Sequence, residues 1–326
     1  MKKIAVLTSG GDAPGMNAVI RAITLTALKN DVEVLGVIRG YNGLMKGDFV
    51  DLTADAVADI ITKGGTMLYS ARSPEFKTEE GMAKAIATCK ENGIEGIAVI
   101  GGDGSFRGAR DLSVRGIPTV GVTGTIDNDI GCCDYTVGYD TALNTIVSVV
   151  DRIRDTTQSH DRCFVIEAMG RGAGYLALNS GIACGATAIL IPEVDFDVEK
   201  DVIDKIKFEQ SRGRRHFIIM TSEAPEVKAK IGSVEELAKK INEETGVESR
   251  ATVLGHLQRG GSPTLRDRVI GTRMGNYAAH LLIEGKGNRV VAIKDDNLFD
   301  LDIIDALNTK KQLDADLYRV AVETAV

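Results

Sequence analysis

Short apolar runs alternate with longer amphipathic stretches along most of the chain. A short apolar run between turn residues is typical of a buried strand, and apolar positions at a 3.6-residue period are typical of a helix. The expected strands are residues 4–8, 33–38, 96–100, 119–122, 163–169, 188–191, 217–221, 252–255 and 290–293. The expected helices are residues 16–29, 79–92, 139–157, 199–211, 234–245 and 267–284. This alternation predicts an α/β fold in which helices cover both faces of parallel sheets.

The chain has 326 residues, which corresponds to two domains of about 150 residues each. It contains no Gly-, Ser- or Pro-rich linker and no short-period repeat. The stretch 131–138 is the best candidate for a crossing between the domains.

Polar, glycine-rich segments follow several of the expected strands. These segments are residues 9–15, 101–105, 123–129, 170–174 and 256–261. In an open parallel sheet, ligands bind beyond the carboxyl ends of the strands. We therefore expect these loops to form the functional site.

Composition and charge exclude several classes of partner. With 39 Lys and Arg against 46 Asp and Glu, the net charge is −7, so no general basic surface exists to hold a nucleic acid. The five cysteines form no C-x-x-C pair and the chain has only four histidines, which argues against a zinc framework and for reduced thiols. The N-terminal apolar run is too short for a signal peptide or a membrane span. We expect a cytoplasmic protein with no nucleic-acid or membrane partner.

Two of the glycine-rich loops fit a bound phosphate. Residues 10–15 join a strand to a helix, where backbone N–H groups and the helix end favour an anion, although a plain tight turn fits equally well. They match neither the Walker loop nor G-x-G-x-x-G. Residues 101–105 read Gly-Gly-Asp-Gly-Ser, in which the glycines leave room for a polyphosphate and Asp103 is a hard oxygen ligand suited to Mg²⁺.

Asp127 and Asp129 lie two residues apart in the loop after the strand at 119–122. In an extended segment both side chains would leave on one face, and their repulsion would raise the proton affinity of one of them. Such a pair suits a general base that takes a proton from a sugar hydroxyl. A turn with solvated acids is the alternative.

Five arginines lie beside these loops, and a guanidinium group matches the geometry of phosphate oxygens. Together they indicate binding sites for two phosphates, although each alone could be a surface residue. They are Arg72, Arg162, Arg171, Arg250 and Arg259.

Several motifs together resemble the bacterial ATP-dependent 6-phosphofructokinase family. They occupy residues 7–17, 100–105, 124–129, 169–171 and 253–263, in the family's order and spacing. The resemblance implies two doubly wound, Rossmann-like domains with the active site between them. Residues 1–138 and 258–308 would bind ATP and Mg²⁺, and residues 139–257 and 309–326 would bind the sugar phosphate. The reaction would be phosphorylation of the 1-hydroxyl of fructose 6-phosphate by Mg-ATP, the committed step of glycolysis, in a homotetramer.

The resemblance also implies roles for individual residues. Asp127 would be the base for the sugar hydroxyl, with Asp129 tuning it and holding Mg²⁺ together with Asp103. Gly11, Arg72 and Arg171 would contact the transferring phosphoryl group. Further ATP contacts would be Ser73, Gly102, Gly104, Ser105 and Gly108. Sugar-phosphate contacts would be Thr125 (also counted as catalytic), Ile126, Met169, Gly170, Glu223, His256 and Arg259, with Arg162 and Arg250 reaching across from a neighbouring subunit.

A second, effector site for ADP or phosphoenolpyruvate is also implied, but its pattern is broken. Matching residues are Arg21, Arg154 and Gly185, and a basic loop is formed by Arg212, Arg214, Arg215 and His216. Leu25 and Ala54 replace arginines that are usual in the family, and Thr187 replaces a metal-binding glutamate. We expect weak or absent regulation by these effectors. A merely solvated basic loop is the alternative.

Other functions compete with this interpretation. Pyrophosphate-dependent relatives typically carry Asp at position 104 and Lys at 124; both are glycine here, which we expect to leave room for a nucleotide. Another sugar-phosphate kinase or a pyrophosphate-dependent enzyme is the alternative within the family. A non-catalytic nucleotide-binding module would lack Asp103, Asp127 or Arg171, yet all three are present. An NAD-dependent oxidoreductase is opposed by the missing dinucleotide fingerprint.

Overall fold

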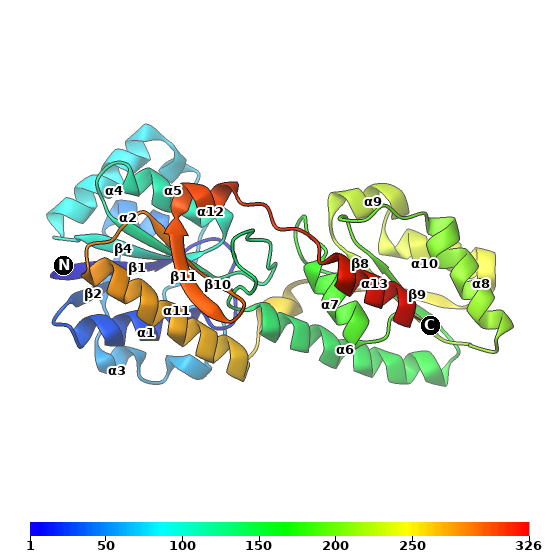
Figure 1. Ribbon diagram of the computed structural model, residues 1–326. Helices are drawn as coiled ribbons and strands as arrows, with labels where there is room; N and C mark the ends of the chain where they lie inside the picture. The colour runs from blue at the N-terminus through cyan, green and yellow to red at the C-terminus, as the bar shows by residue number, and fades with distance from the viewer. Residues whose placement is uncertain (326) are drawn as a thin grey trace. The chain divides into compact units, whose positions relative to one another are not determined.

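The computed structural model describes residues 1–325 and divides the chain into two compact units (Figure 1). Unit 1 comprises Met1–Thr141 and Arg259–Lys311, and unit 2 comprises Ala142–Gln258 and the segment from Gln312 onward. The chain therefore passes between the units three times. The first passage, after Thr141, lies just beyond the stretch 131–138 expected from the sequence.

Unit 1 is built on a seven-stranded sheet with the strand order β11-β10-β5-β4-β1-β2-β3. Its central strands are parallel, and β3 and β11 pair antiparallel at the two edges. The strands are β1 (Lys3–Thr8), β2 (Glu33–Val37), β3 (Phe49–Asp51), β4 (Gly96–Gly101), β5 (Thr119–Thr123), β10 (Arg289–Lys294) and β11 (Asn297–Asp302).

The sheet is parallel through its core, as expected, and the antiparallel strands at its two edges were not among the expected strands. At the β10–β11 edge, Asp295 and Asp296 join the strands with φ values of 49° and 59°. Two successive residues with positive φ form the two-residue turn that matches the twist of a hairpin. The returning strand β11 is only half-buried, so no apolar run marks it in the sequence.

Helices cover both faces of this sheet (Figure 1). On one face α1 packs along α11, where Gly275 allows close approach because an added Cβ would lie 2.6 Å from the Val19 carbonyl oxygen. On the other face α5 covers β4 and β5. The helices are α1 (Met16–Leu28), α2 (Tyr41–Lys46), α3 (Ala54–Val57), α4 (Glu79–Glu91), α5 (Asp103–Ser113), α11 (Leu265–Ile283) and α12 (Ile303–Asn308), with 3₁₀ turns at Ile60–Thr62 and Glu75–Lys77.

Unit 2 contains a four-stranded, wholly parallel sheet with the order β7-β8-β6-β9. Its strands are β6 (Cys163–Ala168), β7 (Ala188–Leu190), β8 (Phe217–Ser222) and β9 (Ser249–Val253). Its helices are α6 (Tyr139–Ser159), which begins in unit 1, α7 (Tyr175–Ala183), α8 (Asp204–Ser211) after a π turn at Glu199–Ile203, α9 (Pro225–Ile231), α10 (Val234–Thr245) and α13 (Ala315–Thr324). The expected strand at 252–255 is displaced, because Gly255 has φ +52° and opens the 3₁₀ turn Gly255–Arg259.

The cysteines are all buried and none forms a disulfide in the described part of the chain. Burial raises the pKa of Cys89, Cys132 and Cys163 to about 12, so their thiols stay protonated at neutral pH. Across residues 1–325, no helix has the length and apolar character needed to span a membrane.

Asp267 joins α11 to the start of α6. It is fully buried and accepts hydrogen bonds from the Gly138 and Thr141 N–H groups at 2.8 Å each, and from the Thr141 hydroxyl. N–H groups in the first turn of a helix have no acceptor within the helix, and the Asp267 carboxylate supplies acceptors for those at the start of α6. Burial raises the pKa of Asp267 from 3.8 to about 6, although these hydrogen bonds lower it.

We expect Asp267 to make stability depend on pH. Because its pKa is raised in the folded state, its protonation favours folding, and this contribution is lost as pH rises through about 6. Relative to Asp267→Asn, the wild-type free energy of unfolding should fall by about 3 kcal/mol between about pH 4 and pH 7. Urea unfolding across this range measures the difference, with Asp296→Asn as an exposed control. A difference that does not change with pH would contradict the expectation.

Candidate functional site

Three loops of unit 1 meet at the carboxyl edge of neighbouring strands. The strands β1, β4 and β5 are adjacent, and their connections are joined by hydrogen bonds from Ser9 N–H to Ile100 O and from Gly124 N–H to Gly101 O, both 3.0 Å. The Ser105 hydroxyl donates to Ser9 O at 2.9 Å. The chain leaves β1 toward β2 on one side, and β4 and β5 lie on the other, so this edge is the topological switch point where such sheets bind ligands.

The Gly-Gly-Asp-Gly loop leads directly into α5. An added Cβ at Gly101 would lie 2.5 Å from Ser9 O, so the loop fits against the β1 loop only with glycine. Asp103 is the first residue of α5, whose amino end carries a positive potential from the helix dipole. Gly104 is exposed and a Cβ there would meet nothing within 4 Å, which leaves open space beside this helix end.

Gly11 lies against the guanidinium of Arg259. A Cβ at Gly11 would come within 2.9 Å of Arg259 Cζ, and Arg259 Nη1 donates to Asp12 O at 3.0 Å. Arg259 therefore lies within unit 1, beside a predicted phosphoryl contact, although the resemblance places it with the sugar-phosphate group. The sequence does not reveal this contact, because Arg259 and Asp12 are 247 positions apart.

The loop after β5 bends between the two acids. Asn128 has φ +50°, so the segment is not extended and the condition under which Asp127 and Asp129 would share one face is not met. Asn tolerates this left-handed conformation better than most residues. Asp127 is 6% exposed and its N–H donates to the Thr125 hydroxyl at 3.2 Å, whereas Asp129 is half-buried.

The side chain of Asn128 fixes this bend. Its Nδ2 donates to Asp134 O and its Oδ1 accepts from Thr136 N–H, both at 3.1 Å. The Thr136 hydroxyl donates in turn to Thr125 O at 2.7 Å. The sequence analysis missed Asn128, although an Asn between two acids is itself a turn signal.

The predicted ATP contacts Ser73, Ser105 and Gly108 are linked through Tyr41. Its hydroxyl donates to Ser105 O at 2.6 Å, its ring stacks on Phe76 with centroids 4.0 Å apart, and a Cβ at Gly108 would lie 2.8 Å from the ring. The Ser73 hydroxyl accepts from Phe76 N–H at 3.4 Å. Arg72 is exposed beside it. The segment 72–76 is therefore held against α5.

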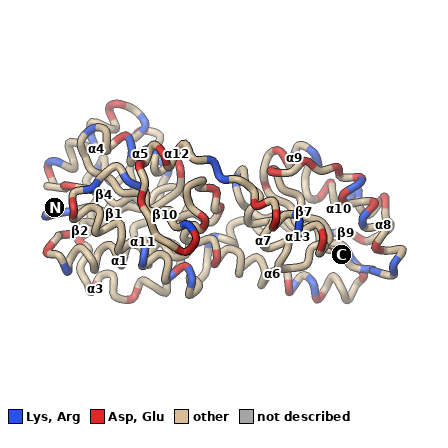
Figure 2. The backbone as a smooth tube through the Cα atoms, in the orientation of Figure 1, with Lys and Arg blue, Asp and Glu red and all other residues tan. Residues whose placement is uncertain are grey.

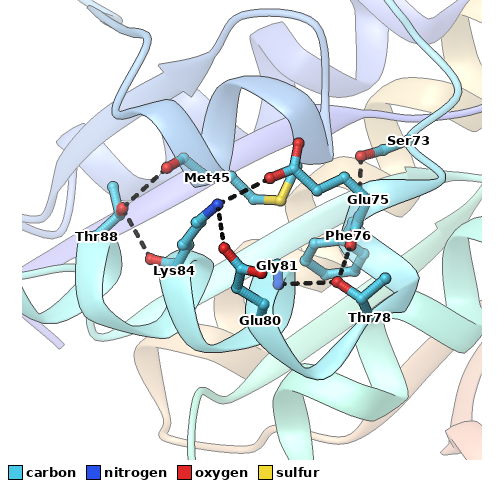
Figure 3. A network of polar contacts seen from close by, with 9 residues as sticks. All are labelled: Met45, Ser73, Glu75, Phe76, Thr78, Glu80, Gly81, Lys84 and Thr88. Carbon is cyan, nitrogen blue, oxygen red and sulfur yellow. Dashed lines mark hydrogen bonds and ion pairs between the residues drawn. The ribbon is translucent and has the colours of Figure 1, made fainter.

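Figure 3 shows the polar contacts that hold this segment from the side of α4. Thr78 caps α4 by accepting from Gly81 N–H at 3.1 Å and donates to Glu75 O at 2.7 Å. Lys84 pairs with Glu75 at 3.1 Å and with Glu80 at 2.9 Å. These exposed ion pairs contribute little stability, so the cap and the Tyr41–Phe76 stack carry most of the support.

In unit 2 the predicted sugar contacts gather at the carboxyl ends of β6, β8 and β9. Met169 N–H donates to Gln258 Oε1 at 3.1 Å, and Arg171 N–H donates to Glu223 Oε1 at 2.8 Å. Gly170 has φ +139°, which strongly favours glycine. The sequence analysis missed the fully buried Gln258 as a support of this turn. The predicted contact His256 is exposed on the 3₁₀ turn that ends in Arg259.

Arg162 and Arg250 lie at the opposite, amino edge of this sheet. Both pair with Glu248, from Arg162 Nη2 at 3.0 Å and from Arg250 Nη2 at 2.5 Å. The Arg162 hydrogen bond, and then the charges of both arginines, hold the pKa of Glu248 below its ordinary value. Because β6 separates the two edges, these arginines do not reach the Met169–Arg171 loop of their own unit.

Part of the predicted effector cluster also gathers in unit 2. Arg154 donates to Cys184 O beside the exposed Gly185, and Arg214 Nε donates to His216 O at 3.3 Å. Burial, then the charges of Arg214 and Arg154, lower the pKa of His216. Arg212 and Arg215 pair with Glu209 and Asp161. Arg21 lies in unit 1, where its Nε donates to Ala58 O at 3.4 Å.

Gly104 and Gly124, the two positions expected to distinguish ATP from pyrophosphate as phosphoryl donor, differ in the space around them. Gly104 faces open space, as expected, whereas a Cβ at Gly124 would meet Ile100 Cγ2 at 3.1 Å and Met16 Cε at 3.5 Å. Position 124 therefore faces packed side chains, and the expectation of open room there is wrong. Figure 2 shows basic and acidic residues interspersed along both units.

A doubly wound sheet with a Gly-Gly-Asp-Gly helix start and two acids at its switch point defines an α/β protein equipped for phosphoryl transfer. The chain belongs to the phosphofructokinase family, whose model matches residues 3–282. It is 52% identical over 326 residues, all of both chains, to the ATP-dependent 6-phosphofructokinase of Bacillus subtilis (strain 168).

Solved structures agree with this fold. The phosphofructokinase of Saccharomyces cerevisiae matches with a TM-score of 0.88 at 31% identity, covering 100% of this chain and 48% of that one, so the present chain spans about half of the yeast chain. A pyrophosphate-dependent phosphofructokinase from Marinobacter aquaeolei matches with a TM-score of 0.86 at 21% identity, covering 100% of this chain and 92% of that one, which shows a common fold. The expected doubly wound α/β class is confirmed.

Proposed function

We propose that this chain transfers the γ-phosphoryl group of ATP to the 1-hydroxyl of fructose 6-phosphate, giving fructose 1,6-bisphosphate and ADP, the committed step of glycolysis. The observation that carries the proposal is the meeting of the Gly101–Ser105 and Thr125–Asp129 loops at the switch point of unit 1. Unit 1 would bind ATP and unit 2 the sugar phosphate.

In the proposed reaction, Asp127 accepts the hydroxyl proton while the sugar oxygen forms its bond to the γ-phosphorus and the bond to the bridging oxygen of ADP breaks. Gly11, Arg72 and Arg171 would hold the transferring group, since this reaction depends mainly on positioning and charge stabilisation. Ser73, Gly102, Gly104, Ser105 and Gly108 would contact ATP. Thr125, Ile126, Met169, Gly170, Glu223, His256 and Arg259 would contact the sugar phosphate.

Asp103 and Asp129 fit a magnesium ion brought in by ATP. No group of three His, Cys, Asp or Glu side chains within residues 1–325 could hold a metal ion by itself. Mg²⁺ characteristically takes only one or two carboxylates and completes its shell with substrate phosphates and water. Both acids lie near the loop 130–133, where the charge of Asp103 acts on Cys132 and that of Asp129 acts on Lys311. Bound there, the ion would neutralise charge on the phosphates.

Arg162 and Arg250 support a homo-oligomer, which the family resemblance makes a tetramer. They lie at the amino edge of β6 and β9, so a phosphate held by them would belong to another subunit's substrate. Free buried thiols support a reducing, cytoplasmic location.

An assay that follows formation of the phosphorylated sugar, with each phosphoryl donor and each acceptor in turn, tests the proposal. We expect turnover with ATP and fructose 6-phosphate, and little with pyrophosphate or with other sugar phosphates. The open space at Gly104 supports the nucleotide as donor. Turnover with pyrophosphate and none with ATP would reverse the donor, and a better acceptor than fructose 6-phosphate would favour another sugar-phosphate kinase.

We expect ADP and phosphoenolpyruvate to have weak or no effects. Each lost charge-assisted contact to phosphate costs about 1.5–3 kcal/mol, so Leu25 and Ala54 in place of arginines would weaken binding by roughly two or more orders of magnitude. The lowered pKa of His216 also leaves it neutral at pH 7. Steady-state kinetics with and without about 1 mM effector decide this. A severalfold shift in half-saturation would show that the remaining basic residues suffice.

A further inference from the structure

The segment that ends unit 1 packs on the loop that follows the two candidate catalytic acids. A Cβ added at Gly131 would strike the Thr309 carbonyl and lie 2.8 Å from Lys310 C. The two backbones are therefore in direct contact at Gly131. In Figure 2 this segment is the basic stretch that follows α12.

Lys311 fastens this contact with its side chain. Its Nζ donates to Cys133 O at 2.7 Å and to Asp134 O at 3.4 Å. The same Asp134 carbonyl accepts from Asn128 Nδ2 at 3.1 Å. Asn128 forms the bend between Asp127 and Asp129. The Asp134 carbonyl, which accepts from both Lys311 and Asn128, therefore connects Lys311 to the turn that positions the two acids.

The charge of Lys311 also fits this place. Lys311 is half-buried; burial lowers its pKa, and the charges of Asp134 and Asp129 act in the opposite direction. A cation beside Asp129 reduces the repulsion among the acids of the loop. Lys310, by contrast, is exposed and carries the same charge one residue earlier.

We propose that Lys311 is a positioning residue for phosphoryl transfer, holding the Asp127–Asp129 turn through the Asp134 carbonyl. The inference rests on the proposed kinase activity for its kinetic consequence. In this role Lys311 acts on the turn through Asp134 and Asn128, and no substrate contact is assigned to it. Its contribution is geometric, because a displacement of about 1 Å at a reacting group can cost about 100-fold in rate.

Three variants test this role. Lys311→Met is expected to lower kcat by about 10- to 100-fold with little change in KM for fructose 6-phosphate. Lys311→Arg keeps a charged donor and should recover most of kcat. Lys310→Met, the matched control, should behave as wild type. An unchanged kcat in Lys311→Met, an equal loss in Lys310→Met, or no recovery with arginine would overturn the proposal.

Asn128→Gly tests the route, since glycine keeps the positive φ and removes the side-chain hydrogen bonds of Asn128. The kcat losses of Asn128→Gly and Lys311→Met should be less than additive in the double variant, because both act on one carbonyl. Fully additive losses would exclude this route.

Hydrogen exchange of the backbone at residues 125–136 gives a measurement that does not depend on the reaction. Exchange should accelerate in Lys311→Met and not in Lys310→Met. If wild-type protein does not phosphorylate fructose 6-phosphate, the proposed function fails, and this measurement still decides the role of Lys311. Unchanged exchange in Lys311→Met would overturn the positioning role even in an active enzyme.

Discussion

Replacing Asp127 by Asn is expected to lower kcat by about 10²- to 10⁴-fold, the usual contribution of a positioned general base. Asn keeps the shape of the side chain but cannot accept the hydroxyl proton. Asp127 is 6% exposed and its N–H is held by the Thr125 hydroxyl, so the variant should stay folded and keep most of its sugar-phosphate affinity. Steady-state kinetics with ATP and fructose 6-phosphate measure the change.

The matched control for Asp127→Asn is Asp296→Asn, which removes an exposed acid from the β10–β11 turn of the same unit. It should leave kcat unchanged. Near-normal turnover of Asp127→Asn would transfer the role of base to Asp129 or to water.

Arg162→Ala and Arg250→Ala are each expected to raise KM for fructose 6-phosphate by about 10- to 100-fold, the equivalent of one lost charge-assisted bond to phosphate. The guanidinium groups of Arg162 and Arg250 both pair with the carboxylate of Glu248. One carboxylate balances only one of the two positive charges, so the other charge is available to bind a phosphate. KM for ATP should change little.

Arg319→Ala serves as the control for these arginine variants, because Arg319 is an exposed arginine of α13 that is already paired with Asp316 and Glu323. It should leave both KM values unchanged. An equal rise in KM for ATP in Arg162→Ala would point to a general loss of structure rather than a lost phosphate contact.

The sequence predicts the parallel core well because strands buried on both faces are continuous apolar runs, as in β4, whose residues are all buried. It predicts the edge strands poorly. In β3 none of the residues Phe49–Asp51 is buried, so its pattern does not differ from that of a loop. The stretch 228–232 had no interpretation from its sequence; in the structure most of it belongs to α9, which buries Val227 and Ile231 in the core of unit 2.

The candidate site also has features that the sequence predicts and features that it does not. The meeting of the β1, β4 and β5 loops follows from a general property of parallel sheets and was predictable. The placement of Arg259 on the Gly11 loop depends on a contact across 247 residues and was not. Nor was the sharing of Glu248 by Arg162 and Arg250, because nothing in a single sequence shows which strand edges face one carboxylate.

The order in which the strands of unit 1 are joined has a consequence for synthesis on the ribosome. β5 pairs with β10, which lies on the far side of all of Ala142–Gln258. At about 5–20 residues per second, β5 waits roughly 10–30 s for this neighbour to be translated. During that interval the open side of β5 is an unpaired strand edge, a template for pairing with other chains. The nascent chain is therefore most in need of a chaperone while unit 2 is being made.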